Sequence, residues 1–471
     1  MQMGSDMNMN QIESVYFIGA GGIGMSALVR FFLANGKYVA GYDRTPSELT
    51  SALSAEGAVI HFEDSVELIP ERCRNVGNTL VVYTPAITAD SNTEMRWFID
   101  RGFTLQKRAQ VLGTATQNMD ALCVAGTHGK TTTSAMTSHI LDGTEEGCNA
   151  FLGGILKNTH SNLMISKRTK RVVVEADEFD RSFHCLRPLR TVVTAIDADH
   201  LDIYGTYENY VESFRHYVSL IRPGGDLILR NGLEDRLRPE LQHGVQQWSY
   251  SADNGNFHAT NVRKADGGIV FDFVSPLGNI DDVALGVPAI INIENGVAAM
   301  AMAQLSGAPA SVIRERMASF RGTDRRFDFH LKTSAKVYVS DYAHHPEELR
   351  QCAISMRGLY ADKKITAIFQ PHLYSRTRDF HKQFADSLSL FDEVWLLDIY
   401  PARELPIPGV TSELIAKDIR PGVFKGVVSM EQVPDLVRNI ATDVEVLVTV
   451  GAGDLDNLAD RITEILSEGM V

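Results

Sequence analysis

The chain has few cysteines, and their arrangement argues against a fold held together by disulfide bonds or by a zinc ion. Its five cysteines, Cys73, Cys123, Cys148, Cys185 and Cys352, are dispersed over 471 residues and form no CxxC pair. An odd, scattered set of thiols indicates neither a disulfide framework nor a zinc site. We therefore expect a protein of the reducing cytoplasm.

Basic charge is also scarce, and long apolar runs are missing. Lys and Arg number 45 against 59 Asp and Glu, which gives a formal net charge of -14. Because nucleic-acid binding needs clustered Lys and Arg, we expect no nucleic-acid partner. Residues 15–29 form the most apolar early stretch, but four glycines interrupt it, so it is too short and too rich in glycine to cross a membrane. The Met-rich start, MQMGSDMNMN, lacks the pattern of a secretory signal and is expected to be a loose tail.

Three stretches of the chain alternate short apolar runs with amphipathic segments, which is typical of βα units on a parallel sheet. The first contains VYFIGA, KYVAGYD and TLVVYTP; the second ALCVAG, RVVVEAD and TVVTAID; the third KVYVSDY, KITAIFQ, EVWLLDIY and EVLVTVGAGD. Between the last two, FHATNVRKADGGIVFDFV predicts a β-hairpin with its turn at ADGG. We expect an α/β protein of three domains, at residues 1–117, 118–324 and 325–471.

The segment GTHGKTT, residues 126–132, lies between the strand-like LCVA and the helix-like SAMTSHIL. A phosphate-binding loop requires this context. Glycines let backbone N–H groups approach phosphates, while Lys130 can reach the β and γ oxygens and Thr131 can ligate Mg²⁺. Only two residues separate Gly126 from Gly129, which is shorter than the usual spacing, so a chance turn rich in Gly and Thr is the alternative.

A second glycine-rich turn occurs in VYFIGAGGIGMSALVRFF, with Asp43 at the end of the next strand candidate. Its glycines are Gly19, Gly21, Gly22 and Gly24. This pattern alone suggests NAD, but the same backbone suits any pyrophosphate, including that of a uridine diphosphate, and a purely structural turn also remains open.

Acidic residues follow two strand candidates of the second stretch. Glu175, Asp177 and Glu178 come after RVVVEAD's strand, and Asp197, Asp199, His200 and Asp202 come after TVVTAI. Carboxyl ends of adjacent parallel strands meet at one sheet edge, where these groups can hold a divalent metal. Each acid alone would more often be a cap or a solvated loop residue.

The third stretch carries a further cluster, in DYAHHPEEL (residues 341–349) and FQPHLYSRTRDF (residues 369–380). Both segments follow strand candidates, so we expect Tyr342, His344, His372 and Arg376 to converge at one edge. There Arg376 can pair with a substrate carboxylate. A single histidine would more often be structural.

Together, GTHGKTTT, EADEFDRSF, DADHLD, INIEN, GTDRRFDF, DYAHHP and FQPHLYSRTRDF resemble the motifs of the Mur ligases, in the expected order over nearly the whole chain. The resemblance implies an N-terminal Rossmann-like module for a UDP sugar, a central P-loop ATPase-type α/β domain and a C-terminal Rossmann-like α/β domain that binds an amino acid. It is strongest to members that join L-alanine to UDP-N-acetylmuramate in cytoplasmic peptidoglycan synthesis, and so in cell-wall biogenesis, cell shape and cell division. ATP and Mg²⁺ are the implied cofactors.

The same resemblance assigns roles to individual residues. The UDP sugar would be bound by Gly19, Ala20, Gly21, Gly22, Ile23, Gly24, Ser26, Asp43, Thr84 and Arg108. ATP would be bound by Gly126, Thr127, His128, Gly129, Lys130, Thr131, Thr132, Asn292, Asn295, Arg325 and Asp341. Mg²⁺ would be held by Thr131, Glu175 and His200, the catalytic residues would be Lys130, Glu175, His200 and Arg326, and the amino acid would be bound by Tyr342, His344, His372 and Arg376.

The chemistry that this set implies is carboxylate activation. The lactyl carboxylate of the sugar is an anion that resists attack by an amine, and transfer of the γ-phosphoryl group of ATP to it gives an acyl phosphate, with charge stabilised by Lys130, Mg²⁺ and an arginine. The amine of L-alanine then displaces phosphate. Water must be excluded, so we expect the third domain to close over the site.

Three positions depart from the family pattern. Ala195 stands where Asn is frequent, so a contact on the metal or phosphate side is absent or made by water. Ile291 replaces a frequent His before the first Asn of INIEN, which leaves the packing of adenine open. Leu373 stands where Arg is frequent, so the carboxylate of the amino acid would rest on Arg376 alone.

Other functions remain open at this point. A murein tripeptide ligase would use the same UDP sugar with a different acceptor. An NAD-dependent oxidoreductase would account for the first glycine turn with Asp43 but not for the phosphate loop, and a catalytically silent nucleotide-binding regulator is a third alternative. We expect no membrane insertion and a monomer or homodimer.

Overall fold

The computed structural model describes residues 11–237, 240–265, 268–402 and 404–468. Contacts within the chain group it into two compact units. The first comprises Met1–His258, Ser275–Gly278 and Val297–Arg316, and the second comprises Ala259–Val274, Asn279–Gly296 and Met317–Val471. The expected N-terminal tail, residues 1–10, lies outside the described residues.

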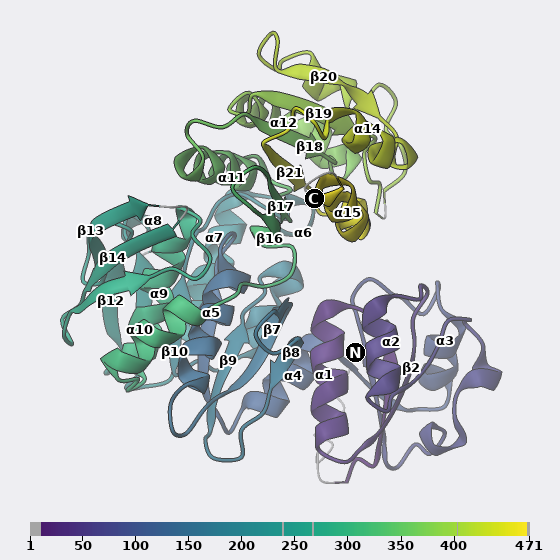
Figure 1. Ribbon diagram of the computed structural model, residues 1–471. Helices are drawn as coiled ribbons and strands as arrows, with labels where there is room; N and C mark the ends of the chain where they lie inside the picture. The colour runs from purple at the N-terminus through teal and green to yellow at the C-terminus, as the bar shows by residue number, and fades with distance from the viewer. Residues whose placement is uncertain (1–10, 238–239, 266–267, 403, 469–471) are drawn as a thin grey trace. The chain divides into compact units, whose positions relative to one another are not determined.

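The first unit begins with a parallel sheet of order β3-β2-β1-β4-β5 (Figure 1). Its strands are β1 (Ser14–Ile18), β2 (Tyr38–Tyr42), β3 (Val59–His61), β4 (Thr79–Tyr83) and β5 (Thr104–Lys107). The connecting helices are α1 (Ile23–Ala34), α2 (Glu48–Ala55), α3 (Thr93–Asp100) and α4 (Arg108–Thr116), with the short helices η1 (Val66–Leu68) and η2 (Glu71–Cys73). All five residues of β1 are buried, as expected for the central strand of a parallel sheet covered on both faces.

A second sheet of the same unit has the order β12-β11-β10-β6-β9-β7-β8. Its strands are β6 (Asp120–Ala125), β7 (Asn149–Leu156), β8 (Ser161–Met164), β9 (Arg171–Glu175), β10 (Arg190–Val193), β11 (Asp226–Arg230) and β12 (Gln246–Tyr250). The helices are α5 (Lys130–Asp142), η3 (Phe179–Cys185), α6 (Leu201–Tyr204), α7 (Tyr207–Ser219) and α8 (Glu234–Leu237). Its strands pair in parallel, except that β7 runs antiparallel to β8.

The two sheets of the first unit share one hydrophobic core. Buried residues from both form a continuous cluster, and the rings of Phe31 and Phe151 lie 5.5 Å apart. Arg30 of α1 donates to Asn162 of β8 at 2.6 Å and forms an ion pair with Glu56. Helix α1 therefore packs against β7 and β8 of the second sheet.

The second unit contains a three-stranded sheet of order β13-β14-β15 and a six-stranded sheet of order β16-β17-β21-β18-β19-β20. The small sheet comprises β13 (His258–Ala265), β14 (Gly268–Val274) and β15 (Ile280–Ala284). The large one comprises β16 (Asp328–Lys332), β17 (Val337–Asp341), β18 (Ile365–Phe369), β19 (Glu393–Leu397), β20 (Phe424–Val428) and β21 (Val446–Val450). Its strands are parallel apart from β16, which runs antiparallel to β17.

Helices connect the strands of the large sheet. They are α11 (Pro346–Leu359), α12 (Tyr374–Leu388), α13 (Glu413–Ala416), η4 (Met430–Gln432), α14 (Val433–Ile440), η5 (Leu455–Leu458) and α15 (Ala459–Ser467). Two further helices, α9 (Ile291–Leu305) and α10 (Ala310–Ser319), contribute residues to both units. Among the described residues, no helix is both long and apolar enough to cross a membrane.

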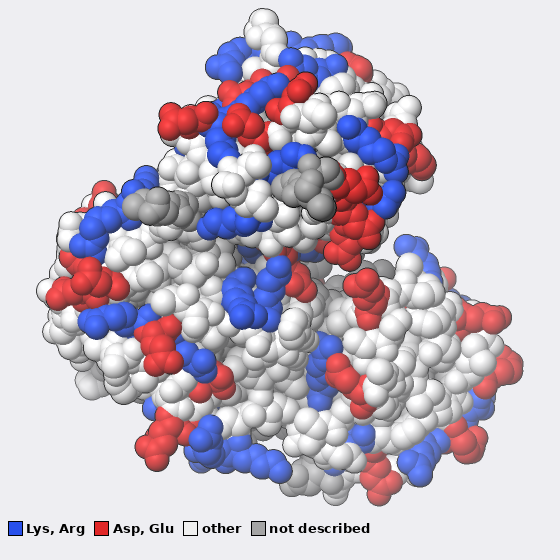
Figure 2. Space-filling view, in the orientation of Figure 1, with Lys and Arg blue, Asp and Glu red and all other residues white. Residues whose placement is uncertain are grey.

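The predicted α/β class is confirmed, and each apolar run named in the sequence forms a strand. The predicted hairpin is part of a three-stranded sheet, with β15 added to it, and the central residues of its turn, 266–267, lie outside the described residues. The domain boundaries at 117/118 and 324/325 stay predictions. Figure 2 shows basic and acidic side chains interspersed over the visible face.

Candidate active site

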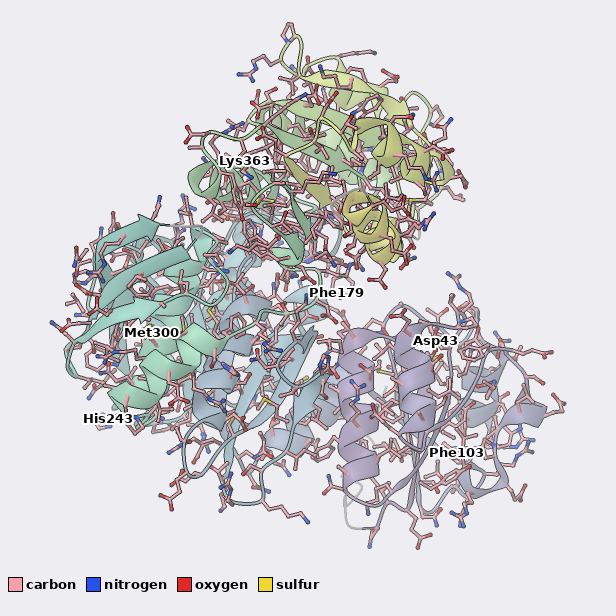
Figure 3. The ribbon with its side chains drawn as sticks, in the orientation of Figure 1. Asp43, Phe103, Phe179, His243, Met300 and Lys363 are labelled. Carbon is pink, nitrogen blue, oxygen red and sulfur yellow. The ribbon has the colours of Figure 1, made fainter. Side chains whose placement is uncertain are left out.

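Strand register brings the first glycine turn to a sheet edge. Ile18, Tyr42 and Tyr83 pair side by side at the carboxyl ends of β1, β2 and β4, so the residues that follow each strand meet. Gly19 has a φ of +90°, and a Cβ atom there would lie 2.8 Å from the Thr84 side chain. Asp43, labelled in Figure 3, accepts the Gly21 N–H at 2.7 Å. The structure thus brings together four of the predicted UDP-sugar residues, Gly19 with Thr84 and Gly21 with Asp43.

Arg108 joins this turn to the acidic strand ends. A Cβ atom on Gly24 would lie 2.8 Å from Arg108 Nη1, so the guanidinium rests against the turn. Arg108 Nη2 also donates to Asp177 Oδ2 at 3.1 Å. A small cavity is lined by Arg108, Glu175 and Asp177 among others. This positive group therefore lies between the place expected for the diphosphate and the place expected for the metal.

Other predicted residues of this turn differ in their exposure. Gly22 and Ile23 are exposed at the start of α1, whereas Ala20 is buried. Ser26 is also buried; its hydroxyl donates to Ile23 O at 2.8 Å and accepts from Asn162 Nδ2 at 2.9 Å. The hydroxyl of Ser26 is thus used in packing α1, and its contact with the UDP sugar stays a proposal.

The phosphate loop follows β6 and ends at the start of α5. Gly126 has a φ of +132° and Gly129, the residue before α5, a φ of +80°. A Cβ atom on Gly126 would overlap the hydroxyl of Thr194 and lie 2.8 Å from Ala195 N. Only glycine fits this position, because the loop passes directly against the residues after β10.

Thr127 fastens the loop to the same segment. Its N–H donates to Ala195 O at 3.0 Å, its hydroxyl donates to Asp197 O at 3.1 Å and it accepts from Asp197 N at 2.9 Å. Thr194 donates to His128 O. The loop is therefore held in shape by backbone contacts, to which Ala195 contributes through its carbonyl group.

Lys130 is the charged centre of the loop. Its Nζ donates to Gly126 O at 2.6 Å and lies 2.9 Å from Glu178, whose side chain is 1% exposed. Burial alone would lower the pKa of Lys130, but the charges of Glu178, Asp177 and Glu175 raise it above its ordinary value. The ammonium group is therefore charged, and a phosphate entering the loop competes with Glu178 for it.

Thr131 and Glu175 form the part of the predicted metal site that is already assembled. Thr131 Oγ1 donates to Glu175 Oε1 at 3.1 Å, and Gly153 N donates to Glu175 Oε2 at 3.1 Å. A Cβ atom on Gly153 would overlap this carboxylate. Hydroxyl and carboxylate oxygens suit Mg²⁺, which in nucleotide sites takes one or two carboxylates and fills its other positions with waters and phosphate oxygens.

His200, the third predicted metal residue, lies beside Asp199 and Phe179. It has a φ of +52°, its Nε2 lies 3.6 Å from Asp199 Oδ2, and its ring lies 5.2 Å from that of Phe179, labelled in Figure 3. Within the described part of the chain, no group of three or more His, Cys, Asp or Glu side chains is close enough to hold a metal ion. The metal role of His200 stays a proposal.

In the second unit, three rings of the predicted amino-acid pocket meet at the carboxyl edge of the large sheet. The ring centroids of Tyr342 and His344 lie 5.2 Å apart, and those of His344 and His372 lie 6.0 Å apart. Burial lowers the pKa of His344 below its ordinary value. The charge of Glu348 raises this pKa, but the charges of Arg376 and Arg326 lower it. His344 is therefore neutral near pH 7, and Arg376 is close enough to act on its charge.

Arg325, Arg326 and Asp341 lie beside the same pocket. Both guanidinium groups lie over the Tyr342 ring, at 4.8 and 4.9 Å from its centroid. Asp341 accepts from Phe327 N at 2.9 Å and from Ala343 N at 2.8 Å, and burial raises its pKa to about 6 despite the charge of Arg326. These predicted residues are brought together with Tyr342.

The predicted adenine-facing residues lie at the start of α9. Asn292 donates to Val287 O at 3.1 Å and Asn295 donates to Asn292 Oδ1 at 3.0 Å, and both side chains are buried. Their mutual hydrogen bond fixes the orientation of Asn292. Their contact with adenine stays a proposal.

Sequence reasoning missed Tyr400, which lies in the pocket, and Glu404, which holds the start of α12. The Tyr400 ring stacks on His372 at 5.7 Å, and Tyr400 O accepts from Leu373 N at 3.0 Å. Glu404 accepts from Ser375 N at 2.9 Å. Leu373 itself has a φ of +72°, a region that favours glycine. A tyrosine and a glutamate after an apolar strand carried no signal that distinguished them from loop residues.

Comparison with known proteins covers the three α/β stretches. Residues 14–119 match the model "Mur ligase family, catalytic domain", residues 124–303 match "Mur ligase middle domain" and residues 325–453 match "Mur ligase, glutamate ligase domain". A UDP-N-acetylmuramate–L-alanine ligase of Phocaeicola vulgatus is 60% identical over 98% of this chain and 100% of its own length. One of Flavobacterium johnsoniae is 47% identical, over 98% and 100%.

Solved structures agree with this likeness. A UDP-N-acetylmuramate-alanine ligase from Thermotoga maritima matches with a TM-score of 0.79 at 25% identity, covering 96% of this chain and 98% of that one. A murein peptide ligase from Psychrobacter arcticus matches with a TM-score of 0.69 at 21% identity, over 97% and 99%. The second match shows a common fold.

Proposed function

The chain belongs to the Mur ligase family, and we propose that it joins L-alanine to the lactyl carboxylate of UDP-N-acetylmuramate with hydrolysis of ATP to ADP and phosphate. The observation that carries this proposal is the 60% identity, over nearly the full length of both chains, to a ligase of that name. The reaction belongs to peptidoglycan precursor synthesis. We further propose a cytoplasmic location and action as a monomer or homodimer.

The phosphate loop supplies the groups that carboxylate activation needs. Lys130 is charged and held 2.6 Å from Gly126 O, where it can neutralise the γ-phosphoryl group as it moves to the lactyl oxygen and forms an acyl phosphate. Thr131 and Glu175 are the residues we propose to hold Mg²⁺, with His200 as a further ligand. When bound, the ion would offset negative charge on the phosphates. Arg108 is placed to steady the sugar between its diphosphate and its carboxylate.

The second unit would supply the amine. Arg376 would pair with the carboxylate of L-alanine, and the neutral imidazole of His344 can accept a proton from the ammonium group, so that the free amine attacks the acyl carbon. The tetrahedral intermediate then expels phosphate. Arg326 would act on the transferred phosphoryl group, and Tyr342 and His372 would bound the pocket.

The decisive experiment measures phosphate release from ATP and Mg²⁺ with UDP-N-acetylmuramate, run separately with L-alanine, glycine, L-serine and the murein tripeptide. Release that requires both the UDP sugar and L-alanine is expected. Phosphate release with the UDP sugar and the tripeptide, but not with L-alanine, would replace this function by that of a tripeptide ligase. The carboxylate-activation chemistry would then still hold. Omission of Mg²⁺ and its replacement by Mn²⁺ test the cofactor.

The first glycine turn does not favour NAD. In dinucleotide-binding folds the acidic residue after the second strand binds the ribose hydroxyls. Here the Asp43 carboxylate instead accepts from Gly21 N at 2.7 Å and from Thr45 N at 3.1 Å. We expect no binding of NADH by fluorescence, and saturable NADH binding would revive the oxidoreductase alternative.

A further inference from the structure

A cavity of about 140 Å³ lies in the second unit, at the edge of the large sheet opposite to the amino-acid pocket. Its lining residues come from the amino-terminal parts of β18, β19 and β20, from the end of α14 and from the loop before β21. They are Lys364, Thr366, Glu393, Trp395, Lys425, Asn439, Ile440, Asp443 and Val444. The neighbouring Lys363 is labelled in Figure 3. Because these strands are parallel, their starts share one edge and their ends carry His372 and Tyr400 roughly 16 Å away. We call this space the amino-edge cavity.

The amino-edge cavity is lined by two ammonium groups, of Lys364 and Lys425, and by two carboxylates, of Glu393 and Asp443. Lys364 Nζ lies 3.0 Å and Lys425 Nζ lies 3.2 Å from the same oxygen of Glu393, Oε1. Each ammonium group carries three N–H donors, so one shared carboxylate oxygen leaves most of them for other acceptors. Burial alone would raise the pKa of Glu393, but the two lysines lower it below its ordinary value, and the carboxylate is therefore already engaged as an anion.

Trp395 adds an apolar wall. A Cβ atom on the adjacent Gly426 would lie 3.1 Å from the ring, so glycine at this position of β20 makes room for the indole. Ile440 and Val444 complete the apolar part of the lining.

We propose that the amino-edge cavity binds a small carboxylate that carries a short apolar group. The carboxylate would share Lys364 and Lys425 with Glu393, and the apolar group would pack on Trp395 and Ile440. A volume of about 140 Å³ suits a ligand of roughly six non-hydrogen atoms, since an apolar cavity of about 150 Å³ holds benzene. This site lies apart from the substrate sites of the proposed function and does not depend on them.

The test uses the full chain labelled with 5-fluorotryptophan, because its three tryptophans, Trp97, Trp248 and Trp395, give three ¹⁹F resonances. Isobutyrate is titrated against chloride at constant ionic strength, and Trp395→Phe assigns the resonance. We expect a saturable shift of the Trp395 signal, while Trp97 and Trp248 stay unchanged and report that the fold is intact.

Two variants and two other probes decide the chemistry. Lys425→Met and Lys364→Met should each weaken isobutyrate binding at least tenfold, whereas Lys417→Met, at an exposed lysine outside the cavity, should not change it. Isobutanol and inorganic phosphate should bind more weakly than isobutyrate. No saturable shift, equal binding by the lysine variants, or equal binding of isobutanol or phosphate would overturn the proposal.

Discussion

A buried carboxyl group in the N-terminal sheet should make the stability of the first unit depend on pH. Glu94, at the start of α3, has a side chain with no exposed surface, and burial raises its pKa to about 7. Tyr16 OH lies 2.5 Å from Glu94 Oε2 and 2.8 Å from His61 Nε2, and Ser65 N donates to Glu94 Oε1 at 3.1 Å. Burial lowers the pKa of His61, so its neutral Nε2 can accept the Tyr16 proton.

These contacts satisfy every group when Glu94 is protonated: the carboxyl donates to Tyr16, Tyr16 donates to His61, and Ser65 donates to the carbonyl oxygen. The carboxyl has a higher pKa in the folded state than the ordinary 4.5. Its contribution to stability is therefore complete below about pH 4.5 and is lost as the pH rises through 7. A difference of about 2.5 units corresponds to about 3 kcal/mol in the free energy of unfolding.

Glu94→Gln copies the protonated state, because its amide can donate to Tyr16 and accept from Ser65. We expect it to unfold like the unsubstituted protein at pH 4.5 and to be more stable by up to about 3 kcal/mol at pH 8. Urea unfolding followed by Trp97, in α3, measures this in a Trp248→Phe, Trp395→Phe background. The exposed Glu67→Gln is the control, and parallel pH curves for Glu94→Gln and its parent would refute the reasoning.

Three further predictions concern the proposed reaction. Lys130→Ala should abolish phosphate release while circular dichroism and the melting temperature show a folded protein; substantial remaining turnover would contradict the role of Lys130. Gly153→Ala should raise the Mg²⁺ concentration for half-maximal activity at least tenfold, because the new methyl group overlaps the Glu175 carboxylate; an unchanged Mg²⁺ titration would show that Glu175 does not hold the ion. Arg376→Gln should raise the KM for L-alanine at least tenfold with little change in that for ATP, since one charge-assisted pair is worth about 1.5–3 kcal/mol; an unchanged KM for L-alanine would remove Arg376 from the pocket.

The central strands could be predicted from the sequence because both of their faces are buried. β6 and β21 read as continuous apolar runs, and all five residues of β21 are buried. Edge strands gave no such signal: β12, QQWSY, has exposed residues at its start, and β8, SNLM, has only two apolar residues, which follow two polar ones. Their pairing depends on neighbouring strands that are distant in sequence.

The residues of the candidate sites also fall into two groups, those that a local sequence pattern reveals and those that only the fold brings together. Glycine turns, Lys130 and Thr131 could be found because a strand, a short loop and a helix fix their geometry locally. The contacts of Glu178 with Lys130 and of Tyr400 with His372 join residues 48 and 28 positions apart, and no local pattern encodes them. The register of parallel strands explains why Thr84 meets Gly19 and Asp43 meets Gly21: residues after neighbouring strands share an edge.

The backbone conformation of Leu373 sets the stability of the protein against the rigidity of its pocket. A φ of +72° for leucine costs about 1–3 kcal/mol, and this turn is held by hydrogen bonds from Leu373 N to Tyr400 O and from Tyr400 N to Pro371 O. Glycine at position 373 would relieve the strain, but it would also make the backbone next to His372 more flexible. Laboratory evolution for heat resistance should therefore accept glycine at position 373, and evolution for turnover should remove it.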